Sequence, residues 1–135
     1  PGMGERTITL DCDVLQADGG TRTAAVTGAY VALYQALLKL VRQRVLHHVP
    51  LNSAVAATSV GLVDDAVLLD MCYEEDTRAS VDFNVVMSDQ GEFVEVQGTG
   101  EERPFSRERM NEILSIAEGG IRSLFEHQKA VVDAL

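Results

Sequence analysis

The sequence predicts an α+β fold in which helices cover one face of a mostly antiparallel sheet. Three observations lead to this prediction. Two long segments, residues 24–46 and 106–132, carry apolar residues at every third or fourth position, as amphipathic helices do. Four short apolar runs of β-forming residues lie between them. A further segment with alternating apolar residues, 7–15, precedes the first helix and predicts a strand.

The composition indicates a globular protein with an acidic surface. The chain has 135 residues, of which 46% are hydrophobic, and a formal net charge of −10. This length suits one ordinary domain or two small layers that share a core. We expect neither an apolar run of membrane-spanning length nor a leader sequence, and we therefore expect a cytoplasmic protein with no membrane partner. The net charge argues against simple nucleic-acid binding, because phosphate backbones repel an acidic surface.

The four central runs predict two hairpins. Asp64 and Asp65 form a short turn within the first pair, and residues 88–91 (Ser-Asp-Gln-Gly) form the turn of the second pair. The runs are residues 54–63, 66–72, 82–87 and 93–97. Cys12 and Cys72 lie in strand-like segments without a second ligand at metal-binding spacing, so we interpret both as reduced core residues.

The predicted helices contain signals at their ends and glycines inside them. Pro50 follows the first helix, and Ser106 is a good N-cap for the last one. Gly28 predicts a close approach between helix and sheet, whereas Gly119 and Gly120 predict either a kink or a tight contact.

The turn between the first predicted strand and the first helix is a candidate anion site. Residues 18–23 (Asp-Gly-Gly-Thr-Arg-Thr) place two glycines directly before a helix. The N-terminus of a helix presents unpaired N–H groups and a positive dipole end to a bound anion. Arg22 adds a guanidinium that can bind a phosphate with two parallel hydrogen bonds. An ordinary turn, capped by Thr21 or Thr23 with Arg22 in solvent, explains the same residues.

A cluster of acidic residues is a candidate catalytic or metal site. Its members are Asp70, Glu74, Glu75, Asp76 and Asp82. If Asp76 and Asp82 converge, they can hold Mg²⁺, or one can stay protonated and act as a general acid. A solvated acidic turn is the alternative. An anion site beside such carboxylates would suit phosphoryl transfer, but spacing in the sequence does not show that the two clusters meet.

Several segments together carry a family resemblance. They are 11–24 (DCDVLQADGGTRTA), 28–33 (GAYVAL), 59–61 (SVG), 75–76 (ED), 82–87 (DFNVVM), 95–99 (EVQGT), 119–121 (GGI) and 128–129 (QK). In these segments the chain closely resembles the second half of ribonuclease PH over essentially its whole length. Exosome ring subunits share residues 15–21, but Arg22 and residues 82–86 are more similar to the bacterial enzyme.

The resemblance implies a ribonuclease PH-like fold from which much of the N-terminal sheet is missing. Residues 1–50 would be the last strand and helix of the phosphate-binding domain, and residues 51–135 the C-terminal subdomain with the acidic cluster. Family members are phosphate-dependent nucleotidyltransferases. They are phosphorolytic 3′-to-5′ exoribonucleases that trim tRNA 3′ ends, take part in rRNA processing, and release nucleoside diphosphates.

The resemblance also assigns roles to particular residues. Gly20, Thr21 and Arg22 would bind the attacking inorganic phosphate, which is a co-substrate. Asp76 and Asp82 would form the catalytic carboxylate pair and hold Mg²⁺, with the acid role given to Asp82 and the metal role to Asp76.

The partners that the resemblance implies are RNA and further protein chains. The RNA would be a tRNA 3′ end or another single strand, and the protein would be a homo-oligomer, a hexameric ring of dimers. An N-terminal half supplied by another chain would complete the enzyme and contribute a second phosphate-contacting arginine and basic residues that meet RNA. The alternative is a non-catalytic ring subunit or RNA-complex scaffold of the same fold.

Overall fold

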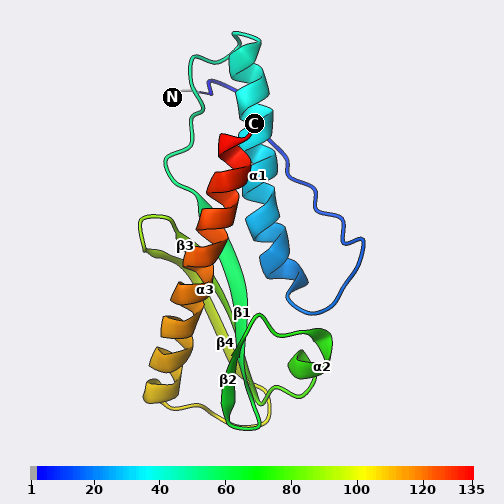
Figure 1. The fold of residues 1–135 in the computed structure, drawn as a ribbon, viewed down its shortest axis with the longest axis vertical. Helices are drawn as coiled ribbons and strands as arrows, with labels where there is room; N and C mark the ends of the chain where they lie inside the picture. The colour runs from blue at the N-terminus through cyan, green and yellow to red at the C-terminus, as the bar shows by residue number, and fades with distance from the viewer. Residues whose placement is uncertain (1–2) are drawn as a thin grey trace.

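A computed structural model describes residues 3–135 and confirms the α+β architecture (Figure 1). Within these residues one antiparallel sheet has the strand order β2-β1-β3-β4. The elements are α1 (Thr21–Arg42), β1 (Val55–Val63), β2 (Ala66–Leu69), α2 (Tyr73–Asp76), β3 (Val81–Ser88), β4 (Phe93–Gly100) and α3 (Arg107–Asp133). The predicted division of the chain into residues 1–50 and 51–135 stays a prediction. Residues 1 and 2 of the first part lie outside the described residues.

Both predicted hairpins are present. Asp64 and Asp65 have φ angles of 49° and 65°, the left-handed conformation that a two-residue type I′ turn requires at both positions. The strand β2 is shorter than the predicted 66–72 run, because Asp70 also adopts a positive φ of 55° and turns the chain away. The second hairpin joins β3 to β4 with an irregularity in register at Val86 and Met87.

The helix α3 covers one face of the sheet and forms the main core with it. Ile113, Ala117 and Ile121 pack against side chains of β1 and β3 such as Val60 and Phe83. The Ser106 side chain accepts a hydrogen bond from the Arg109 amide at 3.2 Å, which confirms the predicted N-cap. The helix runs unbroken through its two glycines, and the Cβ of an alanine at position 120 would press on Leu69. The tight contact is therefore observed at Gly120, whereas a Cβ at Gly119 would meet nothing within 4 Å.

The helix α1 contacts the end of β1 and runs beside α3 (Figure 1). Thr27 Oγ1 accepts from the Ala57 amide at 3.0 Å and donates to the Ala57 carbonyl at 3.2 Å, on the edge of β1 that β2 does not reach. Gln128 Nε2 on α3 donates to the carbonyls of Thr27 and Val55, each at 2.9 Å. The close approach predicted at Gly28 is wrong, since a Cβ there would meet nothing within 4 Å.

The strand predicted at residues 7–15 is absent, and the segment is an exposed irregular chain. A strand needs a neighbour to accept its backbone hydrogen bonds, and the part of the chain that the structure describes offers none here. The side chains of Ile8, Leu10, Val14 and Leu15 are consequently exposed. The core assignment of Cys12 is wrong for the same reason, and Cys72 is half-buried.

One helix departs from the expectation that no segment has membrane-spanning character. By length and composition, α1 is apolar enough to cross a membrane, with a mean hydropathy of 1.4 in its most apolar window. Core helices of soluble proteins also meet this criterion. Only 6% of that window is buried among residues 3–135, so much of the surface of α1 is uncovered in this chain.

Two glycines give a test of the packing. We expect Gly98→Ala to lower the free energy of unfolding by about 1–3 kcal/mol, because the new Cβ would overlap the buried Phe83 ring. That ring also packs edge-to-face on Phe105, with centroids 5.0 Å apart, so it cannot move without cost.

Gly119→Ala is the matched control, because a Cβ there meets nothing within 4 Å inside a helix. This change should raise the free energy of unfolding by up to about 1 kcal/mol. Urea unfolding of the two variants measures both effects. Equal midpoints for Gly98→Ala and the parent chain would contradict the packing described for Phe83.

Candidate functional site

The Gly-Gly turn leaves the first turn of α1 open to a ligand. Gly20 is the N-cap residue with a φ of 56°, and no side chain caps the amides that follow it. Thr23 Oγ1 donates to the Gly20 carbonyl at 2.9 Å, so neither threonine is the N-cap that the simpler interpretation required. The N–H groups of residues 21–23 precede the first helical hydrogen bond, which Ala24 donates to Gly20.

The same turn is fastened to the acidic loop. Gly19 has a φ of 78°, and a Cβ at this position would overlap the carbonyl oxygen of Met71. Only glycine therefore fits there. Asp18 accepts a hydrogen bond from the Tyr73 amide at 3.3 Å, at the start of α2. The segment before the helix and the loop that ends in Asp76 are thus joined by a close approach at Gly19 and by the hydrogen bond to the Asp18 side chain.

The register of the sheet places polar side chains on the face opposite the α3 core. Phe83 belongs to that core, so its neighbours Asp82 and Asn84 point to the other face. Asp82 pairs with Thr99, and Asn84 pairs with Ser59 on one side and with Gln97 on the other. Directly opposite residues share a face, so one polar surface extends across β1, β3 and β4.

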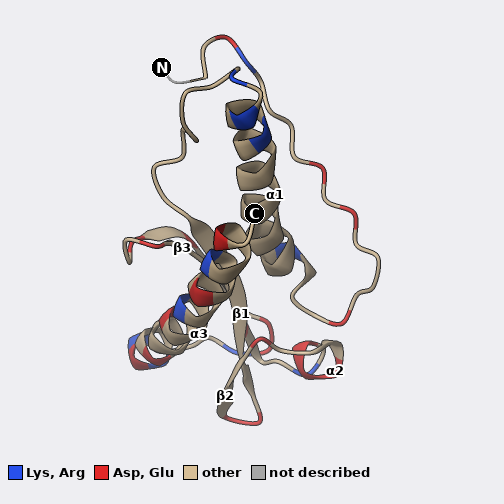
Figure 2. Cartoon of the chain, turned by 45° about the horizontal axis from the view of Figure 1, so that its top comes forward, with Lys and Arg blue, Asp and Glu red and all other residues tan. Residues whose placement is uncertain are grey.

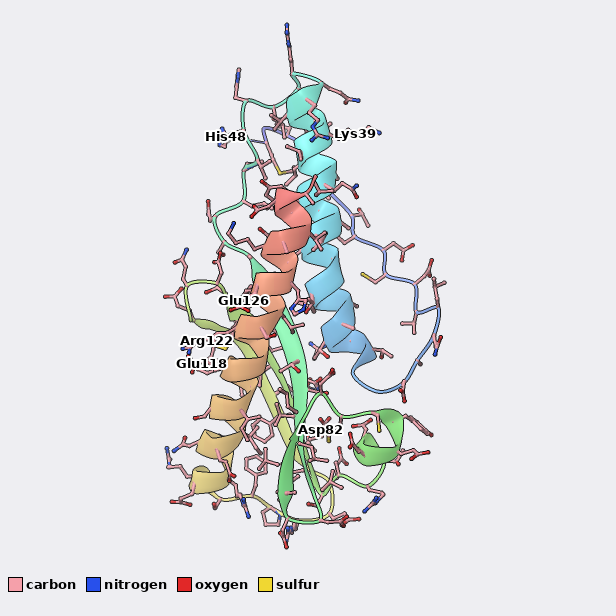
Figure 3. All side chains as sticks on the ribbon, viewed as in Figure 1. Lys39, His48, Asp82, Glu118, Arg122 and Glu126 are labelled. Carbon is pink, nitrogen blue, oxygen red and sulfur yellow. The ribbon has the colours of Figure 1, made fainter. Side chains whose placement is uncertain are left out.

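Arg22 reaches this polar surface from the start of α1. Its Nη2 lies 2.7 and 3.0 Å from the two carboxylate oxygens of Glu95, and its Nη1 lies 2.8 Å from Gln97 Oε1. Arg22 and Asp82 are therefore on the same face of the sheet, which the sequence alone did not show. Figure 3 places Asp82 between the strands and the α2 loop.

The surroundings of Asp82 favour the protonated form of its carboxyl group. Burial raises its pKa, and the neighbouring charges of Asp76 and Glu101 raise the pKa further. Asp76 therefore lies close enough to Asp82 to influence its carboxyl group electrostatically. Two carboxylates that repel one another favour either a shared proton or a bound cation.

The carboxylate pair is chemically suited to Mg²⁺, a hard cation that prefers oxygen ligands and keeps several waters. Within residues 3–135, however, no group of three or more histidine, cysteine or acidic residues is arranged to hold a metal ion. Asp76 and Asp82 are the residues that would hold it.

Ser59 is a site residue to which the sequence reasoning gave no role. It is 4% exposed, and its hydroxyl has no hydrogen-bond partner among the described residues. A Cβ at Gly20 would lie 3.5 Å from both Ser59 Oγ and Asp70 Oδ1. A buried hydroxyl without a partner is costly, so a serine inside the apolar run 54–63 was the available signal.

The charges of the molecule are unevenly distributed (Figure 2). Basic residues gather at the C-terminal end of α1, whereas acidic residues follow the N-terminal segment and the loops around α2. An RNA strand that reached the polar surface would therefore meet mostly repulsive charge from this chain.

The family described as "3' exoribonuclease family, domain 2" matches residues 53–120. The chain belongs to the 3′ exoribonuclease family. It is 61% identical over 130 residues to a ribonuclease PH of Corynebacterium efficiens, an alignment that covers 96% of this chain and 53% of that protein. A ribonuclease PH of a Geobacillus species is 53% identical over 134 residues, with 98% and 52% covered. The chain spans about half the length of the curated relatives it matches.

Solved structures share the fold of this chain. Rice (Oryza sativa) Rrp46 matches with a TM-score of 0.68 at 14% identity, covering 88% of this chain and 51% of that one. The Archaeoglobus fulgidus exosome with RNA bound to the active site matches with a TM-score of 0.69 at 19% identity, covering 84% and 45%. The predicted resemblance to ribonuclease PH is therefore confirmed by the sequence relatives, and the solved structures confirm the fold.

The titration of Asp82 tests the electrostatics of the site. In Asp76→Asn we expect the pKa of Asp82 to fall and yet remain above its ordinary value, because burial is the larger cause of the shift. Carboxyl carbon NMR during a pH titration measures this. Asp133→Asn, at the far end of α3, is the control and should leave the pKa of Asp82 unchanged.

The same raised pKa makes folding depend on pH. The protonated form of Asp82 suits the fold, so its stabilising effect is complete below the ordinary pKa and is lost as the pH rises through the raised value. Asp82→Asn should flatten that part of the stability curve. An ordinary pKa for Asp82 in the parent chain would contradict both expectations.

Proposed function

We propose that this chain is the catalytic half of a phosphorolytic 3′-to-5′ exoribonuclease that trims tRNA 3′ ends with inorganic phosphate. One observation carries the proposal: the open N-terminus of α1 with Arg22 and the half-buried Asp82 lie on one face of the sheet. An anion site and a proton donor side by side are what phosphorolysis requires. The relatives named ribonuclease PH support the same activity.

Phosphate would bind at the start of α1. The backbone N–H groups of the Gly20–Arg22 turn point toward an anion there, and the helix dipole adds a favourable field. The guanidinium of Arg22 supplies charge-assisted hydrogen bonds. The hydroxyl of Ser59 is near enough to Gly20 to donate a further hydrogen bond to the same anion.

The reaction transfers one nucleotidyl group to the bound phosphate. A phosphate oxygen attacks the phosphorus of the last phosphodiester, and the bond from that phosphorus to the 3′ oxygen of the preceding nucleotide breaks. Asp82, whose pKa is raised by burial and by the charges of Asp76 and Glu101, would give its proton to the leaving 3′ oxygen. A nucleoside diphosphate and an RNA shorter by one nucleotide result. Positioning and charge neutralisation do most of this work.

Mg²⁺ would be held by Asp76, with Asp82 close by, and would neutralise negative charge between phosphate and RNA. This assignment separates the two carboxylates by role. Asp82 handles the proton, and Asp76, at the end of α2, holds the cation. The repulsion that raises the pKa of Asp82 is consistent with this pairing.

The remaining half of the fold would complete the enzyme. The uncovered surface of α1 and the exposed apolar side chains of residues 7–15 are surfaces that such a half would cover. The added part would supply the strands that pair with residues 7–15, a second phosphate-contacting arginine, and basic residues that meet RNA. We further propose a cytoplasmic hexameric ring of dimers that acts on tRNA and other single-stranded RNA.

Reconstitution tests the proposal directly. This chain is incubated with single-stranded RNA, phosphate and Mg²⁺, alone and then with the first half of the Corynebacterium efficiens relative as a separate polypeptide. We expect nucleoside diphosphates to appear, by anion-exchange chromatography, only in the completed sample and only with phosphate. A completed, folded complex that releases none would favour the non-catalytic ring subunit or scaffold instead.

Two variants of the completed protein test the residue roles. Arg22→Ala should raise the phosphate KM about ten- to a hundredfold, because it removes charge-assisted hydrogen bonds to the anion. Asp82→Asn should lower kcat by about two to four orders of magnitude with little change in the phosphate KM, because it removes the proton donor. Arg122→Ala is the control, since Arg122 forms an ion pair with Glu118 on the exposed side of α3 (Figure 3). Wild-type kinetics in both site variants would refute the assignment.

A further inference from the structure

We propose that Glu95 and Gln97 are positioning residues that hold the Arg22 guanidinium in the orientation in which it binds phosphate. This inference rests on the proposed function and extends it to the edge strand β4, which pairs with β3 beside Asp82 through Thr99. The two residues would act through Arg22 and not by contacting the substrate.

The contacts that carry this inference use only part of the guanidinium. Arg22 has five N–H donors, and its bonds to Glu95 and Gln97 come from Nη2 and Nη1. The Nε–H group, and donors of the two amino groups that these bonds do not use, stay available. A phosphate at the start of α1 can therefore still be bound while β4 fixes the plane of the guanidinium.

Arg22 needs such support because little else restrains it. Its side chain is 57% exposed at the first turn of a helix, and a long arginine side chain loses considerable freedom when it binds an anion. The Glu95 side chain is 40% exposed, and ion pairs in such surroundings contribute little to folding stability. The pair thus has a clearer use in orienting Arg22 than in stabilising the fold.

The strand provides a rigid base for both residues. Glu95 and Gln97 are two positions apart on β4, so they lie on the same face, and they pair across to Val86 and Asn84 of β3. Asp82 is the next residue of β3 on this face after Asn84, at a spacing of about 7 Å along the strand. The register of β3 and β4 therefore sets where Arg22 lies relative to the proton donor.

The two explanations of the Glu95 contact predict opposite changes in phosphate affinity when Glu95 loses its charge. Removing the negative charge of Glu95 makes the phosphate site more positive, and a purely electrostatic site would then bind phosphate more tightly. If Glu95 orients Arg22, phosphate binding becomes weaker in spite of the gained charge. The sign of the change separates the two cases.

The experiment compares Glu95→Gln with Glu92→Gln in the completed protein. Glu92 lies in the exposed turn before β4 and carries the same charge, so it is a matched control. We expect Glu95→Gln to raise the phosphate KM about three- to tenfold, the effect of releasing one flexible side chain, with kcat at saturating phosphate unchanged. Gln97→Ala should act in the same direction. Glu92→Gln should match the parent protein.

A second measurement needs no turnover. In protein labelled with ¹⁵N-arginine, restrained Arg22 shows separate Nη signals, which we expect to merge through faster rotation in Glu95→Gln and to stay separate in Glu92→Gln. Titration with inorganic phosphate then gives the affinity at Arg22. Weaker binding in Glu95→Gln together with merged signals supports the inference.

The outcomes separate this inference from the proposed function. Phosphate binding at Arg22 without any phosphorolysis would refute the function and leave the positioning role intact. Equal or tighter phosphate binding in Glu95→Gln would overturn the positioning role, even in a fully active enzyme. A parent protein whose Arg22 signals do not respond to phosphate would overturn it as well.

Discussion

The pairing of β3 between β1 and β4 is the constraint on which the rest of the structure depends. This strand alternates between the two faces of the sheet, with Phe83 in the α3 core and Asp82 and Asn84 on the polar surface. A shift of one residue would bury Asp82 in the core and expose Phe83, which the loss of apolar burial forbids. Core packing on one face therefore fixes the positions of the site residues on the other.

Most of the fold follows from local signals in the sequence, because those signals act within a few residues. The turn at Asp64 and Asp65 and the cap at Ser106 each form from neighbouring atoms, and the structure has both. The proximity of Asp76 and Asp82 was also predictable, since a short loop separates them.

The rest depended on contacts between distant segments. Residues 7–15 have the alternation of a strand, but alternation describes the side chains and cannot supply a neighbouring backbone. The attachment of Arg22 to Glu95 joins positions 73 apart, which no local pattern encodes. Ser59 stood in the matching segment 59–61 and as a polar residue inside an apolar run, but its relevance to the site emerged only from its distance to Gly20.

The path of the chain into the Gly-Gly turn has a thermodynamic consequence. Residues 7–15 lead directly to Gly19 and Gly20, so any partner that orders this segment also restrains the turn that holds the helix N-terminus open. Ordering an irregular segment costs part of the free energy of such an association. The net free energy of binding is therefore smaller than the buried area alone would suggest. In the proposed complete enzyme, a ligand at the turn and the partner then strengthen each other's binding by the same factor, because the coupling between two sites is reciprocal.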